Sequence, residues 1–401
     1  MKQNIESEDK TNYSINRSYF NSKDYILLYI DSFFKTFANS IYAAFTPVVL
    51  YKAGVSVAMI IFIYMIQFLV MGAFSPLAGT LSKKIGVANT KCISYLLKCI
   101  SLILVLTVDT NIKHYISIAL IYGLSGAANN PLNTYIPGKI VGEEFRGRFN
   151  SFTYILRCFS SIIGYIFAGV LLIKNNNTIL IISVFISYFI AYIALLNLDK
   201  EKMKYDIKLV FKESYKYLFQ KENENLKLVS GLRSFIIIER LIAVPLYIYI
   251  SLNDLKTFTI LYVISTIVEL LSLFIAGNNY DKNKIKTFNI ITFIKAIVTS
   301  VFLFAHKVYI LMLNKSIYNL VDDVYDSSYS ALSQSKCERE EKDTLLLSII
   351  HEMCLCFFEF IVLFALLIIS IINVNITFKV MFAGSIIVLF INAKIIKQWN
   401  V

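Results

Sequence analysis

Three carboxylates lie within about one helical turn of one another, at Asp322, Asp323 and Asp326. In a medium of low dielectric, carboxylates this close together cannot all ionise cheaply. We therefore expect at least one of them to hold a proton near neutral pH. A buried group that gains and loses a proton is what proton-coupled chemistry requires.

Asp326 is the first candidate for a proton-coupling group, because it repeats the position of Asn129 in an internal repeat described below. Asp31 and Glu359 are secondary candidates. A permanent ion pair between Asp326 and Arg240 is an equally strong alternative, since charges in apolar surroundings usually pair.

Two bases, Lys35 and Arg233, occupy equivalent positions in the same repeat. Their ammonium and guanidinium groups suit phosphate or carboxylate ligands. The acidic stretch around Asp326 opposes a bound anion unless it is protonated. A cationic, zwitterionic or amphipathic ligand is therefore preferred, and an anion is the alternative.

Other kinds of chemistry find no support in the sequence. His351-Glu352 does not open an HExxH zinc motif, because position 355 is leucine. Cys354 and Cys356 point to different sides of a helix, so no metal site is expected. The sequence holds no GxxxxGK[ST] loop for ATP and no nucleophile-base arrangement. We expect neither enzymatic activity nor a cofactor.

The elements that must position these residues follow from composition. Of 401 residues, 57% are hydrophobic and 16% are charged, and the mean hydropathy is +0.64. A soluble fold has no place for so much apolar surface, whereas each helix that crosses a bilayer needs about 20 apolar residues. The apolar runs are continuous rather than alternating, which argues against a transmembrane β-barrel.

We therefore predict an all-α integral membrane protein with twelve transmembrane helices. The predicted spans are residues 25–50, 55–77, 92–109, 114–137, 149–173, 178–197, 228–251, 257–276, 287–305, 308–333, 344–372 and 378–396.

Charges within these spans nearly cancel, so mutual ion pairing is expected, for example between Asp31 and Lys35. The seven bases are Lys35, Lys98, Arg157, Arg233, Arg240, Lys295 and Lys315. The eight acids are Asp31, Glu239, Glu269, Asp322, Asp323, Asp326, Glu352 and Glu359.

The distribution of lysine and arginine predicts the orientation. The termini and the loops on their side of the membrane carry 26 of these residues, and the opposite loops carry six. Cytoplasmic loops retain basic residues, so we expect a cell-membrane protein with both termini cytoplasmic. The net charge of +12 then reflects topology and attraction to anionic lipid, and needs no nucleic-acid partner. The first 24 residues are polar, so no cleavable signal peptide is expected.

The chain divides into two halves of six spans each, residues 25–197 and 228–396. A cytoplasmic polar segment, 198–227, separates them, and the tails are 1–24 and 397–401. Within the polar segment, residues 207–213 are predicted to form an amphipathic helix on the inner leaflet.

The second half repeats the first. At an offset of 198 residues, Pro47 matches Pro245, Tyr51 matches Tyr249 and Lys35 matches Arg233; at 197, Lys98 matches Lys295 and Asn129 matches Asp326. Six spans separate the copies, so both halves insert with the same orientation around a pseudo-two-fold axis along the membrane normal.

Several local motifs resemble those of a known family. The loop from Gly79 through Lys83 and Lys84 to Gly86 is similar to the glycine, acid, base, glycine loop between helices two and three of the major facilitator superfamily (MFS), with Lys83 replacing the acid. The equivalent loop after the eighth span keeps Gly277, Asp281 and Lys282. In the family this loop latches the two halves together on the cytoplasmic side.

Two further motifs also resemble those of the major facilitator superfamily. The stretch from Pro137 to Arg146 resembles the family's connection between helices four and five. The stretch from Gly164 to Gly169 is similar to the glycine-proline motif of proton-antiporting drug exporters, with Tyr165 replacing the proline. With twelve spans in a 6+6 repeat, the chain resembles a divergent MFS transporter over nearly its whole length.

The resemblance implies that helices one, four, seven and ten line a central cavity, and these helices carry the polar stripes. The candidate cavity residues are Asp31, Lys35, Asn39, Tyr42, Tyr122, Asn129, Asn133, Arg233, Arg240, Tyr247, Asn319, Asp322, Asp323 and Asp326. In family members that exchange organic phosphates, symmetric bases on helices one and seven bind the anion, and the placement of Lys35 and Arg233 is similar.

We therefore predict a monomeric secondary transporter that moves a small solute by alternating access, coupled to protons, with export of a cationic, zwitterionic or amphipathic compound preferred. One alternative is an organic-anion or phosphate exchanger that uses Lys35 and Arg233. The other is a non-transporting membrane sensor or partner platform. The expected partners are the solute, protons and the lipid bilayer.

Overall fold

A computed structural model describes residues 22–43, 45–109, 111–141, 146–198, 211–218, 224–276, 284–305, 307–339 and 344–396, and all regular secondary structure among these is helical. The first half contains α2 (Lys23–Ala43), α3 (Thr46–Lys52), α4 (Val57–Phe74), α5 (Leu77–Ile85), α6 (Val87–Leu106), α7 (Ile112–Ile140), α8 (Arg146–Ile173) and α9 (Asn177–Leu196). A short helix, α10 (Phe211–Leu218), follows. The second half contains α11 (Glu224–Ile238), the π-helical turn η3 (Glu239–Ala243), α12 (Val244–Leu252), α13 (Leu255–Ala276), α14 (Lys284–Phe302), α15 (Val308–Arg339), α16 (Thr344–Ile372) and α17 (Val374–Ile396).

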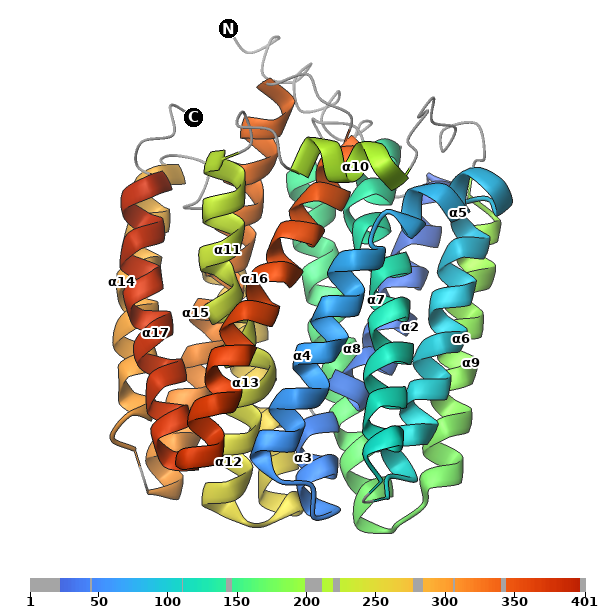
Figure 1. Cartoon of the computed structure of the whole chain (residues 1–401). Helices are drawn as coiled ribbons and strands as arrows, with labels where there is room; N and C mark the ends of the chain where they lie inside the picture. The colour runs from blue at the N-terminus through green and yellow to red at the C-terminus, as the bar shows by residue number, and fades with distance from the viewer. Residues whose placement is uncertain are drawn as a thin grey trace, which may run out of the picture.

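These helices confirm the predicted fold of twelve spans in two halves. The first span is formed by α2 and α3 together, and the seventh by α11, η3 and α12. Figure 1 shows the long helices packed side by side, with α10 lying across one end of the bundle. We refer to this end as the α10 end.

Seven segments of the described chain are long and apolar enough to cross a membrane by length and composition alone. The helices that carry most of the polar candidate residues, α2, α7 and α15, are outside this set. On α9, Ile182, Ile186 and Phe189 are about half exposed along one face. Large apolar side chains exposed at helical spacing are what a lipid-facing surface requires.

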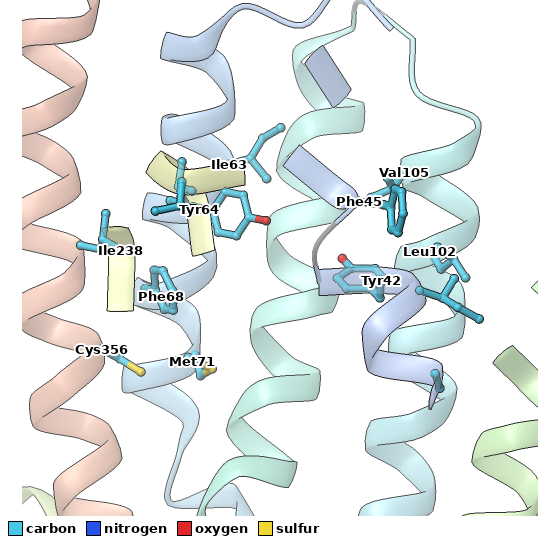
Figure 2. Packing of buried hydrophobic residues seen from close by; sticks show 14 of the residues in the cluster. Tyr42, Phe45, Ile63, Tyr64, Phe68, Met71, Leu102, Val105, Ile238 and Cys356 are labelled. Atoms are coloured by element: carbon cyan, nitrogen blue, oxygen red, sulfur yellow. The ribbon is translucent and has the colours of Figure 1, made fainter. Parts of the chain in front are cut away.

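The most extensive packing between the halves is made by two helix pairs, α4 with α16 and α8 with α13, and α7 also packs on α16. Figure 2 shows the buried side chains Tyr64, Phe68 and Met71 of α4, with Cys356 of α16 and Ile238 of α11 to one side. Both pairs depend on a glycine. A Cβ at Gly72 would lie 3.0 Å from Cβ of Cys356, and a Cβ at Gly169 would lie 2.3 Å from Cγ2 of Thr259. Glycine therefore permits close helix approach at equivalent joints, as small residues do in membrane bundles.

The first and seventh spans are both interrupted near a proline. Pro47 stands at the start of α3, and Pro245 at the start of α12, directly after the π-helical turn. Proline lacks the N–H that an uninterrupted α-helix would use. The repeat that pairs Pro47 with Pro245 in sequence thus has a structural counterpart.

The loop motifs that carry the family resemblance are partly described. Gly86 ends α5 with φ of +88°, a conformation that favours glycine. Gly79 brings α5 close to Ile349 of α16, since a Cβ there would lie 3.3 Å from its Cδ1, while Lys84 is exposed. Gly277, Asp281 and Lys282 lie outside the described residues, as does the side chain of Arg146.

The predicted amphipathic helix over 207–213 has a described counterpart in α10, which begins at Phe211; residues 207–210 lie outside the described part. Its Tyr215 hydroxyl donates a hydrogen bond of 2.7 Å to the carbonyl of Ala73 at the end of α4, and α10 also contacts α16. The helix therefore packs on protein from both halves.

Candidate functional site

An ion-pair network lies inside the second half. Arg233 of α11 contacts Asp326 of α15 at 2.9 Å, and Arg240 of η3 contacts the same carboxylate. Arg240 also lies 3.3 Å from Asp322, which pairs with the buried Lys295 of α14. The pairing expected for Asp326 and Arg240 is therefore present.

These ion pairs lower the cost of keeping Asp322 and Asp326 ionised in the interior. Two of the carboxylates are each held by two bases, and a compensated buried charge is far less costly than a lone one. Crowding of acids alone thus gives no reason for Asp326 to hold a proton. The side chain of Asp323 lies outside the described part. The guanidinium side chain of Arg240 remains 35% exposed, so this network borders accessible space.

A second cluster lies inside the first half. Asp31 accepts a hydrogen bond of 2.9 Å from the Tyr95 hydroxyl and lies 3.5 Å from Lys35, as expected from their spacing, and 4.0 Å from Lys91. Both lysines donate to the side-chain oxygen of Asn133, at 3.2 Å and 2.9 Å. The polar stripes of α2 and α7 thus meet α6 within one half.

Sequence reasoning missed Lys91. The predicted third span begins at residue 92, which assigns Lys91 to a cytoplasmic loop, but α6 begins at Val87 and Lys91 is only 1% exposed. A usable signal was present, because Lys91, Tyr95 and Lys98 are spaced four and three residues apart and form one helical stripe.

Other candidates on α2 face the interior of the first half. The side-chain oxygen of Asn39 accepts hydrogen bonds from Lys98 (3.2 Å) and from the Tyr188 hydroxyl (2.8 Å). The Tyr42 ring stacks on Tyr122 with centroids 4.6 Å apart, and its hydroxyl lies 2.9 Å from that of Ser101.

The remaining candidates lie in different surroundings. Asn129 is buried, with its side-chain oxygen unbonded among the described residues. Asn319 donates to Ser265 at 3.1 Å. The Tyr247 hydroxyl donates to the carbonyl of Ala305 at 2.7 Å. These three do not share one site.

Glu359 of α16 stands apart from the ion pairs. It is 1% exposed, and neither carboxylate oxygen has a hydrogen-bond partner within the described part of the chain. Glu352 and Cys356 on the same helix, with Arg233 and Arg240 opposite, are the titratable groups that act on it. Burying a charged carboxylate without a partner is costly.

An aromatic cluster joins the two halves toward the end opposite α10, where Figure 1 shows α3 and α12. The first half contributes Phe45, Tyr51 and Tyr165, and the second half contributes Tyr249, Phe258 and Tyr262. Phe45 meets Phe258 with centroids 5.7 Å apart, and Tyr165 meets Tyr262 at 5.5 Å. Edge contacts of this kind are favourable aromatic geometry. The tyrosine that replaces the expected proline at position 165 therefore joins the halves.

Two six-helix halves with buried ionisable residues and aromatic contacts between them are the architecture of a polytopic membrane transporter. The sequence matches the Major Facilitator Superfamily over residues 28–345, and the chain belongs to that family. It is therefore a transporter rather than an enzyme, as predicted. No curated protein matches the chain in sequence.

Solved structures show the same fold at low sequence identity. The human organic anion transporter MFSD10 (TETRAN) aligns with a TM-score of 0.64 and 12% identity, over 92% of this chain and 99% of that one. A D-xylose-proton symporter gives 0.66 and 12%, over 94% and 97%. The nucleoside transporter NupG (D323A mutant) gives 0.66 and 13%, over 93% and 99%. These likenesses establish the architecture.

Proposed function

We propose that the chain is a proton-coupled secondary transporter of a small solute that works by alternating access in the cell membrane, with both termini and the α10 end in the cytoplasm. The single observation that carries this proposal is the contrast between its joints and its interior. The halves meet chiefly through two glycine-containing helix pairs and an aromatic cluster, with one hydrogen bond from Asn130 to Glu352, whereas the ion pairs of Lys35 and of Arg233 are each completed within one half. The halves can thus change their relative position without separating those buried charges.

Glu359 is the best candidate for the coupling proton. It is buried, unpaired within the described part, and located on α16, which packs against α4 of the other half. Movement of α16 relative to α4 would change the surroundings of its carboxyl group. Asp326, the first candidate in the sequence analysis, is here placed second, because protonation there would have to release two arginines.

The sequence favoured a cationic, zwitterionic or amphipathic solute, but the arrangement of the interior charges gives no such preference. That preference rested on free carboxylates in α15, and Asp322 and Asp326 are paired with bases. The relatives of known structure include carriers named for an organic anion, a sugar and a nucleoside, so the fold accepts several solute classes. We retain export of a cationic, zwitterionic or amphipathic compound and anion exchange as competing possibilities.

Flux into sealed vesicles tests the proposal. Purified protein in proteoliposomes that contain a pH-sensitive dye would be offered D-xylose, uridine, tetraphenylphosphonium and inorganic phosphate in turn, with and without an imposed pH gradient. We expect one class to move together with protons, and Glu359→Gln to abolish the proton signal. Absence of solute and proton movement across all classes would favour the sensor or platform alternative.

A further inference from the structure

A polar pocket lies within the first half, between α2, α6, α7 and α8. Its polar lining consists of Asp31, Ser32, Lys35, Lys91, Asn133, Thr153 and Arg157. Phe149 near the start of α8 and Pro137 near the end of α7 also line it, which places the pocket toward the α10 end.

The charges that line this pocket do not balance. Three bases, Lys35, Lys91 and Arg157, face one acid, Asp31, so two positive charges are left over. Among the described residues, Arg157 has no carboxylate partner; its Nε donates to the Ser32 hydroxyl at 3.1 Å, and its guanidinium lies over the Tyr154 ring. The network in the second half is more nearly balanced, because two acids, Asp322 and Asp326, face its three bases.

Uncompensated positive charge in apolar surroundings calls for a counter-ion. The bases come from three different helices and so approach the pocket from different sides. Lysine ammonium groups carry three N–H donors and a guanidinium carries five. Asn133 uses one donor of each lysine, Asp31 uses a second donor of Lys35, and Ser32 uses one of Arg157. Several donors therefore remain for a ligand with many acceptor oxygens, such as phosphate or a carboxylate.

We propose that this pocket binds a phosphate or carboxylate group, held by Lys35, Lys91 and Arg157. The anion enters from the α10 end and supplies the negative charge that Asp31 alone does not. This inference concerns binding, so it holds whether or not the chain proves to carry a solute. It also differs from an exchanger that uses Lys35 and Arg233 together, since Arg233 is engaged by Asp326 and none of the described residues of the second half lines the pocket.

Binding of inorganic phosphate to the full chain in neutral detergent tests the proposal. We expect phosphate to raise the melting temperature and to bind with a dissociation constant measurable by calorimetry. Removal of one charge-assisted contact in Arg157→Gln should weaken binding by about ten-fold or more, and Lys91→Gln should act similarly. Asp31→Asn should act in the opposite direction, because it removes the one negative charge in the pocket.

Lys98→Gln is the matched control. Lys98 is a buried lysine on the same helix as Lys91, but it contacts Asn39 and lies outside the pocket lining. Each variant would first be compared without phosphate by its melting temperature, so that loss of folding is distinguished from loss of binding. If Arg157→Gln fails to fold, Arg157→Lys and Asp31→Asn test the anion site instead. We expect Arg157→Lys to weaken phosphate binding and Asp31→Asn to strengthen it.

An experiment with lipid distinguishes the two possible sources of the anion, a lipid headgroup and a free anion in solution. In nanodiscs, added phosphatidylglycerol that competes with phosphate assigns the pocket to a lipid headgroup, and unchanged phosphate binding assigns it to a free anion. Either result supports an anion site. The proposal is overturned if neither phosphate nor phosphatidylglycerol stabilises the protein, or if Arg157→Gln and Lys98→Gln bind phosphate equally well.

Discussion

The side-chain amide of Asn130 on α7 donates a hydrogen bond of 2.5 Å to the carboxylate of Glu352 on α16. This contact joins helices of opposite halves, whereas the ion pairs of Asp31 and Asp326 each stay within one half. A bond between the halves belongs to one conformation, because alternating access requires the halves to change their relative position. The population of conformations should therefore respond to this pair.

Glu352→Ala is expected to shift the population away from the described conformation. A hydrogen bond to a charged group contributes about 1.5–3 kcal/mol, which corresponds to a change of roughly ten-fold or more in the equilibrium. The measurement uses Tyr51→Cys, a substitution within the aromatic cluster, and follows the rate at which a thiol reagent added outside labels this cysteine. We expect Glu352→Ala to raise this labelling rate.

A double-mutant cycle supplies the control for this pair. Asn130→Ala should raise the same rate, and the double variant should add little to either single change. Fully additive effects would show that the two side chains act independently.

Cross-linking the aromatic end should stop transport. The rings of Tyr51 and Tyr249 occupy equivalent repeat positions and lie 6.3 Å apart across the two halves. We expect Tyr51→Cys with Tyr249→Cys, joined by a short bifunctional thiol reagent in a background without native cysteines, to lose solute flux and regain it after cleavage of the linker. Flux that persists in the joined protein would contradict closure of this end as a step of the cycle.

Gly169→Ala is expected to destabilise the contact between α8 and α13. Its new methyl group would meet the Thr259 side chain well inside van der Waals distance, and overpacking of this kind typically destabilises by about 1–3 kcal/mol. The melting temperature in detergent should fall. Gly138→Ala, where an added Cβ meets no atom within 4 Å, is the matched control and should leave it nearly unchanged.

Asp326→Asn and Glu359→Gln should have different effects. The first leaves Arg233 and Arg240 with less compensation, and breaking a buried pair destabilises by about 3–5 kcal/mol. The second replaces an unpaired buried carboxyl group by a neutral one of similar shape, so the melting temperature should be kept while proton-driven flux is lost. Proton-driven flux that survives Glu359→Gln but disappears in a folded Asp326→Asn variant would return the coupling role to Asp326.

Much of the fold could be predicted from sequence because hydrophobic runs and repeats are local or periodic signals. Runs of about 20 apolar residues located the spans, and the match of Pro47 with Pro245 revealed the two halves. The site was less accessible, since ion pairing depends on which helices face each other. Spacing indicated Asp31 with Lys35, but no spacing rule links Lys295 to Asp322, which approach from different helices.

The same limit explains why the anion pocket could not be predicted from the sequence. Lys91 lies next to a predicted span boundary, and Arg157 was recognised only as one intramembrane base among several. Their proximity to Lys35 depends on how α6 and α8 pack around α2, which hydropathy does not report. A charge count by span predicts near neutrality for the whole interior, yet one pocket within it holds a surplus of positive charge.

The interruptions divide the first and the seventh span each into a long and a short helical segment. The breaks near Pro47 and Pro245 set off α3, of seven residues, and α12, of nine, from the longer helices that carry Lys35 and Arg233. Tyr51 and Tyr249 lie on these short segments. We infer that the end opposite α10 opens as a local element that bends at two equivalent hinges, so that a solute is admitted or released there while the charged interior keeps its arrangement.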